Sequence, residues 1–425
     1  MARFKAVRGT RDVLPEEWPY WEHIERAIGR VTSLYGYKRI ATPILEETGL
    51  YVRGVGQGTD IVDKEMYTFQ DRGGRSLSLR PEFTAGIMRA YLENGLHVHP
   101  KPVKLYAIGP IFRYERPEAG RYRQHTQFNV EAIGEQDPAL DFEVIALALH
   151  LFREIGISGT RLQLNSTGCP RCRPQYVRRL VEYYKPRLEL VCSDCRRRYE
   201  RNPLRLLDCK VEQCQPVIAQ APDIREHLCG ECREHFEALL SYLEAAAIPY
   251  EVNRRLVRGL DYYTKTVFEV WVQGIGSQNA ICGGGRYDGL IEELGGPPTP
   301  GIGFGSGMER LVLTLQEQNV AVATPQRPAV FAAYLGPEAK RAALEIVQAL
   351  RAEGIPSLIS FGERSLKAQL RDAHRAGACV AIVLGEEELR DGQIQLKWLD
   401  RGEQARVDRN QLIPTLRQEL AQSRL

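Results

Sequence analysis

Glycine is dense in one stretch of this chain and restricts what that stretch can fold into. The stretch contains the triplet Gly283–Gly285, the pair Gly295–Gly296, and glycine at alternate positions: Gly301, Gly303, Gly305 and Gly307. A residue without a Cβ lets its backbone approach a ligand or a neighbouring strand closely. We therefore expect close approach of this kind between residues 283 and 307.

The length of 425 residues exceeds what one hydrophobic core usually supports, so we expect two or three domains. Apolar runs such as Val144–Leu149 are far too short to span a bilayer. Residues 1–12 carry charges and lack the apolar centre of a signal peptide. We therefore expect a cytoplasmic protein that does not associate with membranes.

Eight of the ten cysteines fall within about sixty residues. They are Cys169, Cys172, Cys192, Cys195, Cys209, Cys214, Cys229 and Cys232. Pairs of the form CxxC are typical of tetrahedral zinc sites, so zinc is one interpretation. Reduced thiols are a second interpretation and disulfides a third.

The same region is basic, since residues 171–210 contain twelve Lys and Arg but five Asp and Glu. The whole chain has a net charge of only +3. A basic island on a mildly acidic body is the pattern expected where a polyanion docks. A solvated surface is the alternative.

Hydrophobic periodicity predicts the main elements. Residues 16–31 form an expected helix, with an apolar face of Trp18, Trp21, Ile24, Ile28 and Val31. Residues 103–114 and 126–133 are expected strands of a hairpin with a long basic loop. Gln127 and Glu131 fall on one face of the second strand, facing either a ligand or solvent.

Beyond residue 326 the pattern alternates between strands and helices. Strands are expected at 329–334, 357–361, 379–384 and 393–399, with helices at 338–352, 365–376 and the C-terminus. This order predicts a small, mostly parallel α/β domain.

Three segments hold functional groups without an evident structural need. They are Arg80–Thr84, the stretch Phe112–Pro117 continuing through Arg121–Gln124, and Gly303–Arg310. The guanidinium of an arginine chelates phosphate oxygens, and its flat face stacks on rings such as adenine. Arg113 and Arg310 therefore suit a nucleotide substrate.

These segments resemble the signature motifs of class II aminoacyl-tRNA synthetases. Thr42–Gly49 resembles the first, dimer-forming motif, Phe112–Glu115 the second, and Gly307–Arg310 the third. Leu256–Tyr263 and Gly283–Leu290 further resemble the two histidine-specific segments of histidyl-tRNA synthetases. Arg8–Asp12 and Ser365–Leu370 also match that family.

The resemblance implies an α+β fold. It predicts a catalytic domain with a six- or seven-stranded antiparallel sheet and a helical insertion, followed by a small α/β anticodon-binding domain. The expected boundaries are 1–164 and 251–325 for the two catalytic parts, 165–250 for the cysteine-rich insertion, and 326–425 for the last domain. The resemblance also implies a homodimer, with histidine, ATP, Mg²⁺ and tRNA(His) as partners.

The resemblance implies roles for particular residues. For histidine they are Glu82, Thr84, Arg113, Gln127, Glu131, Arg258, Tyr262, Tyr263 and Tyr287. Among these, Arg113 and Arg258 are the expected catalytic arginines at the α-phosphate, and packing is the favoured interpretation of Tyr262. ATP is expected at Arg113, Glu115 and Arg310, and the tRNA acceptor end at Arg116, Arg121 and Arg123.

A regulatory subunit of ATP phosphoribosyltransferase is the alternative, because it resembles the same catalytic fold. Such proteins usually lack the last domain and often lose the catalytic arginine, whereas this chain has residues 329–425 and Arg258.

Phe83 and Glu118 depart from the pattern of the histidyl-tRNA synthetase family, which often has Gly at the first position and Gln at the second.

Overall fold

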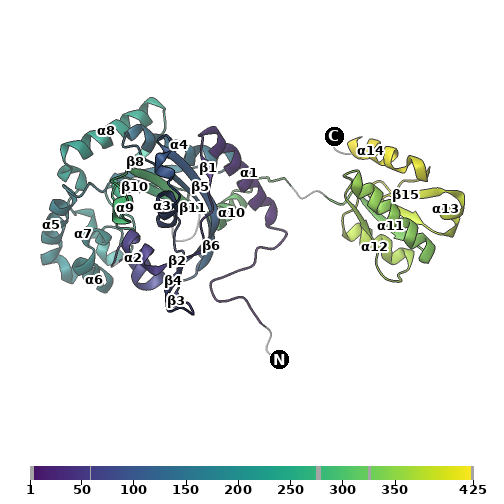
Figure 1. Ribbon diagram of the computed structural model, residues 1–425, viewed down its shortest axis with the longest axis horizontal. Helices are drawn as coiled ribbons and strands as arrows, with labels where there is room; N and C mark the ends of the chain where they lie inside the picture. The colour runs from purple at the N-terminus through teal and green to yellow at the C-terminus, as the bar shows by residue number, and fades with distance from the viewer. Residues whose placement is uncertain (1–3, 58, 274–278, 324–326, 423–425) are drawn as a thin grey trace. The chain divides into compact units, whose positions relative to one another are not determined.

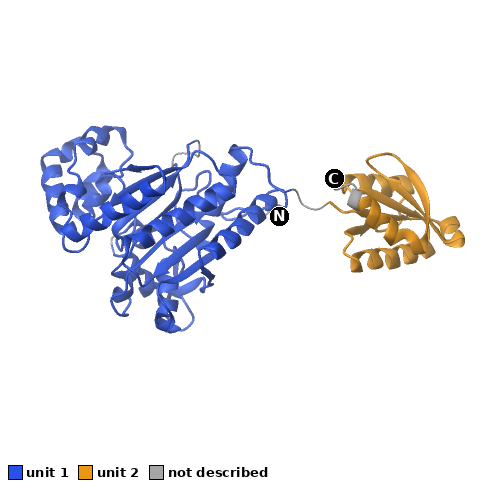
Figure 2. Cartoon of the chain, turned by 90° about the horizontal axis from the view of Figure 1, so that it is seen from above, with its two compact units in different colours: residues 1–323 blue, residues 324–425 orange. Residues whose placement is uncertain are grey.

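The structure is a computed structural model that describes residues 4–57, 59–273, 279–323 and 327–422. Residues 1–323 and 324–425 are two compact units (Figure 2). Each has its own sheet and its own buried core. The boundary lies close to residue 326, where the sequence predicts the last domain to begin. The division of the first unit at 164 and 250 stays a prediction.

An eight-stranded sheet forms the centre of the first unit (Figure 1). Its strands, in spatial order, are β1 (Lys38–Arg39), β5 (Val103–Phe112), β6 (Gln124–Ile133), β11 (Gly301–Gly307), β10 (Ala280–Arg286), β9 (Thr264–Trp271), β7 (Arg161–Ser166) and β8 (Tyr250–Val252). The six central strands pair antiparallel, while β1 and β8 are parallel to β5 and β7. The antiparallel sheet is confirmed, with parallel edge strands bringing it to eight.

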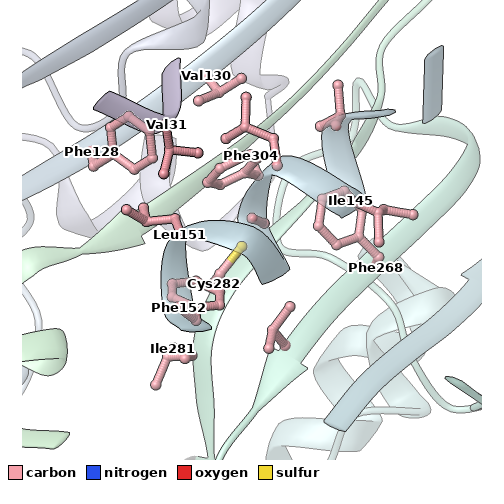
Figure 3. Packing of buried hydrophobic residues seen from close by; sticks show 14 of the residues in the cluster. Val31, Phe128, Val130, Ile145, Leu151, Phe152, Phe268, Ile281, Cys282 and Phe304 are labelled. Carbon is pink, nitrogen blue, oxygen red and sulfur yellow. The ribbon is translucent and has the colours of Figure 1, made fainter. Parts of the chain in front are cut away.

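One face of this sheet is covered by helices α1 (Trp18–Leu34), α4 (Pro138–Glu154), α8 (Gly230–Ala245) and α10 (Met308–Glu317). Alternate side chains of the central strands, such as Phe128 and Phe304, pack beneath the helices (Figure 3). The apolar face predicted for α1 is correct except at Trp18. Trp18 begins the helix and is 43% exposed, whereas Trp21 is buried.

The other face of the sheet carries a second core. Helices α2 (Thr48–Val55), α3 (Thr84–Glu93) and α9 (Leu290–Glu293) lie on this side. A three-stranded sheet, in the order β2 (Leu45–Glu47), β4 (Ser76–Leu79) and β3 (Thr68–Gln70), precedes α3 in the chain. A π-helical turn, η1 (Ile61–Glu65), and a 3₁₀ turn, η2 (Leu96–Val98), complete the connections.

The insertion lies between β7 and β8. Its helices are α5 (Arg173–Tyr184), α6 (Ser193–Arg201), α7 (Gln215–Ala219) and α8, linked by 3₁₀ turns η3 (Lys185–Leu190), η4 (Pro203–Leu206), η5 (Glu212–Cys214) and η6 (Ile224–His227). A separate core joins all eight clustered cysteines to Tyr176, Leu180 and Tyr184. The cysteines therefore form the interior of the insertion.

The second unit has a five-stranded sheet. Its order is β13 (Ser357–Ile359), β12 (Val330–Tyr334), β14 (Val380–Leu384), β15 (Gln393–Trp398) and β16 (Gln404–Asp408), with helices α11 (Pro337–Ala352), α12 (Leu366–Arg375), α13 (Glu386–Asp391) and α14 (Leu412–Gln422), and the turn η7 (Arg409–Gln411). The first three strands are parallel and the last two antiparallel. The predicted elements are confirmed, and α13 and β16 are additions. Across the described residues, no helix combines the length and apolarity that membrane crossing requires.

A buried ionic network joins the sheet to its helices. Arg286, at the end of β10, pairs with Asp141 on α4, and neither side chain is exposed. His235 on α8 contacts the other oxygen of Asp141 at 2.8 Å. Although burial opposes it, Arg286 and His235 lower the pKa of Asp141.

Breaking this network should destabilise the first unit strongly. We expect Asp141→Asn to lower the free energy of unfolding by about 3 kcal/mol, because it removes the fully buried counter-charge of Arg286, although Arg286 keeps its pair with Asp288 at 3.1 Å. Urea denaturation followed by circular dichroism measures the change. Glu182→Gln, at an exposed pair with Arg179, is the control and should cost below about 1 kcal/mol. Equal effects of the two substitutions would contradict the assignment.

Candidate active site

Glycines of β10 and β11 leave room for side chains on the face of the sheet opposite α1 and α4. A Cβ built on Gly303 would lie 2.8 Å from Cδ of Glu131, and one on Gly305 would lie 2.8 Å from Cδ of Gln127. A Cβ on Gly283 would lie 2.6 Å from Cζ of Arg258. These contacts are closer than a real Cβ tolerates, so any other residue here would displace the side chain that lies over it. The expected close approach is confirmed. We call Gly283, Gly285, Gly301, Gly303 and Gly305 the glycine floor.

Two aromatic side chains complete this arrangement. Tyr263 lies over Gly285, with a built Cβ 2.9 Å from Cδ1 of its ring, and Tyr287 lies over Gly301, with a built Cβ closest to Cε2 of its ring. Tyr262 contacts both, with ring centroids 4.8 Å from Tyr263 and 6.0 Å from Tyr287. All three rings are buried.

Glu131 is the most deeply buried acidic group of the site. Its side chain projects from β6 opposite Gly303 and has no exposed surface. The Thr84 hydroxyl donates to Oε1 at 2.6 Å, and the Tyr287 hydroxyl donates to Oε2. Burial raises the pKa of Glu131 from 4.5 to about 8, although both donors oppose the rise. The face of β6 carrying Glu131 is therefore not solvated.

Glu82 lies just before α3 and holds the start of that helix. Its carboxylate accepts from the backbone N–H of Thr84 at 2.6 Å and of Ala85 at 2.8 Å. These donors belong to the first turn of the helix, where N–H groups lack helical partners. Burial raises the pKa of Glu82, against the effect of these bonds. Glu82 thereby fixes Thr84 and, through it, Glu131.

Arg258 faces an acidic partner that the sequence did not reveal. Its guanidinium pairs with Oε1 of Glu269 on β9, while the Trp271 indole donates to Oε2 at 2.7 Å. Burial opposes the shift, but Glu269 raises the pKa of Arg258. Glu269 is an acidic residue in an otherwise mostly apolar strand, and this is the sequence signal that could have identified it as a functional residue.

The remaining arginines come from the hairpin of β5 and β6 and from α10. Nε of Arg113 donates to the Pro81 carbonyl at 2.8 Å, and its Nη1 is 3.9 Å from Oε1 of Glu115. Glu115 also pairs with Arg121. Arg310 donates to the Ala280 carbonyl at 2.9 Å, beside the floor strand β10.

Two arginines of the loop between β5 and β6 differ in their surroundings. Arg116 is exposed. Arg123 is engaged within the protein, with its guanidinium 3.6 Å from the ring centroid of Tyr114 and its Nε donating to the Glu115 carbonyl at 3.2 Å. The Arg123 backbone N–H also donates to Gly9 at 2.7 Å, so the N-terminal segment braces the loop.

The sequence of this chain matches models of known protein families. The family model described as histidyl-tRNA synthetase matches residues 9–172 and 196–311. The chain belongs to the histidyl-tRNA synthetase family. This is a family of aminoacyl-tRNA ligases. A second model, described as an anticodon binding domain, matches residues 320–419.

Curated relatives agree with this family over nearly the whole chain. A histidine–tRNA ligase of Desulforamulus reducens is 51% identical over 406 residues, covering 96% of this chain and 97% of the relative. One of Dehalococcoides mccartyi is 49% identical over 417 residues, covering 98% and 100%.

Solved structures agree as well. The apo histidyl-tRNA synthetase of Staphylococcus aureus matches with a TM-score of 0.81 and 37% identity, covering 97% of this chain and 100% of that one. A structure from Bacillus halodurans, titled as an ATP phosphoribosyltransferase regulatory subunit/histidyl-tRNA synthetase, is 22% identical with a TM-score of 0.62, which shows the fold alone. Because the relatives that are 51% and 49% identical over nearly the whole chain are histidine–tRNA ligases, the regulatory-subunit alternative is not favoured.

Within this synthetase fold, most of the predicted residues meet around the glycine floor. Glu131, Thr84 and Tyr287 are bonded to one another, and Glu82 holds Thr84. Tyr262 packs between two other predicted residues. Arg116 stands apart as an exposed loop residue. The roles of all these residues stay predictions.

The raised pKa of Glu131 predicts a pH-dependent stability. Between about pH 4.5 and 8 the unfolded chain has lost the proton that the folded Glu131 keeps, so stability falls as pH rises through this window. Glu131→Gln removes the titrating group. We expect its melting temperature, relative to wild type, to rise between pH 5 and pH 9 without substrates. Differential scanning calorimetry measures this, and a difference that stays constant with pH would contradict the burial effect.

Proposed function

We propose that the site joins L-histidine to ATP, giving histidyl-adenylate and diphosphate, and then transfers the histidyl group to tRNA(His) with release of AMP. The observation that carries this proposal is buried Glu131, held by Thr84 and Tyr287. A buried carboxyl held by fixed partners suits a substrate whose side chain carries a polar group that can pair with it, such as an imidazole.

Glu131 and Tyr263 meet the two nitrogens of the imidazole in this proposal. A protonated Glu131 donates to a ring nitrogen, whereas its carboxylate accepts from a ring N–H, so either state can pair with histidine. Tyr287 and Tyr262 form the wall. An analogue that lacks the ring nitrogens leaves these buried groups unpaired and is therefore rejected.

Glu82, Thr84 and Gln127 receive the α-ammonium group. Glu82 keeps acceptor capacity beyond its two backbone bonds, because a carboxylate offers about four lone pairs. Thr84 donates its hydroxyl proton to Glu131 and retains an oxygen lone pair for the ammonium. The same hydroxyl thus links the two ends of the substrate pocket.

Activation needs positive charge around the α-phosphate. A carboxylate oxygen of histidine attacks the α-phosphorus, the bond to the β-phosphate oxygen breaks, and diphosphate leaves. Arg113 and Arg258 hold the carboxylate and the α-phosphate and stabilise the charge that develops. In the absence of substrates Glu269 keeps Arg258 charged and oriented.

Arg310 stacks on adenine, and Glu115 helps hold ATP. Mg²⁺ prefers oxygen ligands and enters with the nucleotide phosphates. The buried Glu115 carboxylate, which pairs with Arg121 in the absence of nucleotide, would supply such an oxygen to the ion. When bound, Mg²⁺ neutralises phosphate charge.

The loop 115–123 and the second unit contact tRNA(His) in this proposal. Arg116, Arg121 and Arg123 suit phosphates and base edges of the acceptor end. Arg116 is exposed, and the side chain of Arg121 is 37% exposed. Residues 320–419 match an anticodon-binding domain, which supports a role in binding the anticodon arm.

We further propose a homodimer in the cytoplasm. The segment Thr42–Gly49 resembles the dimer-forming motif of class II synthetases. Ile44 and Leu45 in this segment are 40% and 45% exposed, which is consistent with burial against a second copy.

Two structural zinc ions fit the cysteines of the insertion. The sulfur atoms fall into two quartets, each with all four Sγ within 4.8 Å of one another: Cys169, Cys172, Cys229 and Cys232, and Cys192, Cys195, Cys209 and Cys214. We call these the first and the second quartet.

The sulfur spacing supports zinc over disulfides. Sγ–Sγ distances are 3.7 Å for Cys169–Cys172 and 3.8 Å for Cys192–Cys209. A tetrahedron with Zn–S bonds of about 2.3 Å has edges of about 3.8 Å, whereas a disulfide needs about 2.05 Å. None of these eight cysteines forms a disulfide in the structure.

Arg258→Ala tests the activation step. We expect histidine-dependent ATP–diphosphate exchange to fall by roughly 100- to 1,000-fold, or about 3–4 kcal/mol, because one preorganised donor is lost. Arg258→Lys, which keeps the charge without the planar fork, should recover part of the rate. A loss of less than about tenfold for Arg258→Ala would reject this role.

Elemental analysis of reduced protein, purified without chelators, tests the zinc proposal. We expect about two zinc ions per chain, one for each quartet. Cys232→Ser and Cys209→Ser should each reduce the content to about one. Protein that is folded and contains no zinc would refute the proposal.

A further inference from the structure

The segment that carries Arg258 lies on the cysteine core of the insertion. This segment, residues 253–263, connects β8 to β9, and we call it the Arg258 segment. Val257, the residue before the arginine, packs against the core formed by the eight cysteines. The site and the insertion are therefore in direct contact at the residue next to Arg258.

Polar contacts from residues near the cysteines of the second quartet in sequence reinforce this packing. The Asn202 amide donates to Oδ1 of Asp261 at 2.9 Å. Arg205 lies against Gly259, since a Cβ built there would be 2.7 Å from Nη1 of Arg205. Gln215, which follows Cys214 in the chain, accepts from Arg255.

Residues beside the cysteines of the first quartet contact the far end of the same segment and the start of β9. Arg173, which follows Cys172, donates to the Tyr263 carbonyl and, at 3.5 Å, to the Asp261 carbonyl. Glu231, between Cys229 and Cys232, accepts from Lys265 at 2.9 Å.

Asn202 and Arg205 have little regular structure to hold them in place. They lie between Cys195 and Cys209, where α6 ends at Arg201 and only the short turn η4 follows. Closure of the second quartet fixes both ends of this stretch. A bound metal removes conformational freedom from the chain between its ligands.

The position of Arg258 has little tolerance. Its guanidinium lies directly over Gly283 and pairs with Glu269. A displacement of about 1 Å in a catalytic group can reduce the rate by about 100-fold. A shift of the backbone at Val257 or Gly259 would be transmitted to this guanidinium directly.

We infer that the second cysteine quartet, with zinc bound, is a positioning device for Arg258. Asn202 and Arg205 transmit its geometry to the Arg258 segment, so histidine activation depends on the metal although the metal takes no part in the chemistry. This inference rests on the proposed function and on the zinc proposal, and it assigns the insertion a role in the first reaction step, before tRNA binds.

Hydrogen–deuterium exchange of the full-length protein tests the structural part. In Cys209→Ser, we expect amides in residues 256–263 to exchange faster than in wild type, while β5 and β6 keep their protection. Cys379→Ser, a cysteine of the second unit outside both quartets, is the matched control and should leave the segment unchanged. Unchanged exchange at 256–263 in a Cys209→Ser protein that has lost zinc would overturn the inference.

Arg205→Ala tests the transmission with the quartet intact, and Arg197→Ala, an exposed arginine of α6, is its control. Arg205→Ala should retain both zinc ions. It should lower kcat of histidine-dependent ATP–diphosphate exchange by about tenfold or more and change KM for histidine little. In an Arg258→Ala background the same substitution should have an effect of less than about twofold, because the group that it positions is already absent.

These outcomes separate the inference from the proposed function. One outcome is faster hydrogen–deuterium exchange at 256–263 in Cys209→Ser, together with no histidine-dependent ATP–diphosphate exchange in wild type. It would reject the proposed function and retain the positioning of Arg258. Equal effects of Arg205→Ala with and without Arg258 would reject the positioning and leave the proposed function standing.

Discussion

The close packing of side chains onto the glycine floor is the constraint on which the rest of the site depends. Glu131, Gln127, Arg258, Tyr263 and Tyr287 each occupy the volume that a Cβ would fill on β10 or β11. Because these side chains come from β6, from the Arg258 segment and from the chain after β10, the floor brings together residues that are far apart in sequence. The opposite face of the same strands carries the helix-covered core, so the floor is fixed from behind (Figure 3).

Burial then determines the charge on each side of the site. Glu131 and Glu82 lie where water is excluded, and burial raises the pKa of each carboxyl. Arg258 is partly buried, but Glu269 keeps it charged. The site thus combines carboxyl groups that hold protons readily with an arginine that does not lose its own. This difference suits the recognition of a titrating imidazole beside a negatively charged phosphate.

Much of this organisation could be predicted from the sequence. The hairpin of β5 and β6, the α/β character of the second unit and the glycine-rich strands follow from local periodicity and from the absence of a Cβ. The motifs around Arg113, Arg258 and Arg310 identified the family. The prediction that Trp18 is buried was wrong. A residue at the end of a helix can lie on its apolar face and still extend beyond the core that this face covers.

Other features depend on contacts that no local pattern encodes. Glu269 stands eleven residues from Arg258 in sequence, yet only the fold of β9 makes it the partner of that arginine. Asp141, Arg286 and His235 meet from three distant elements. The CxxC spacing suggested zinc, but Cys192 and Cys195 join Cys209 and Cys214 through tertiary structure. Short elements such as α13 and β16 carry too few residues for a periodic signal.

We propose that this pocket selects histidine for activation by ATP. Amino-acid-dependent ATP–diphosphate exchange, measured on purified, zinc-containing protein with Mg²⁺ and each of the twenty amino acids in turn, tests it most directly. We expect exchange with histidine and with none of the other nineteen amino acids. Exchange with a different amino acid, or no exchange from folded protein, would contradict it.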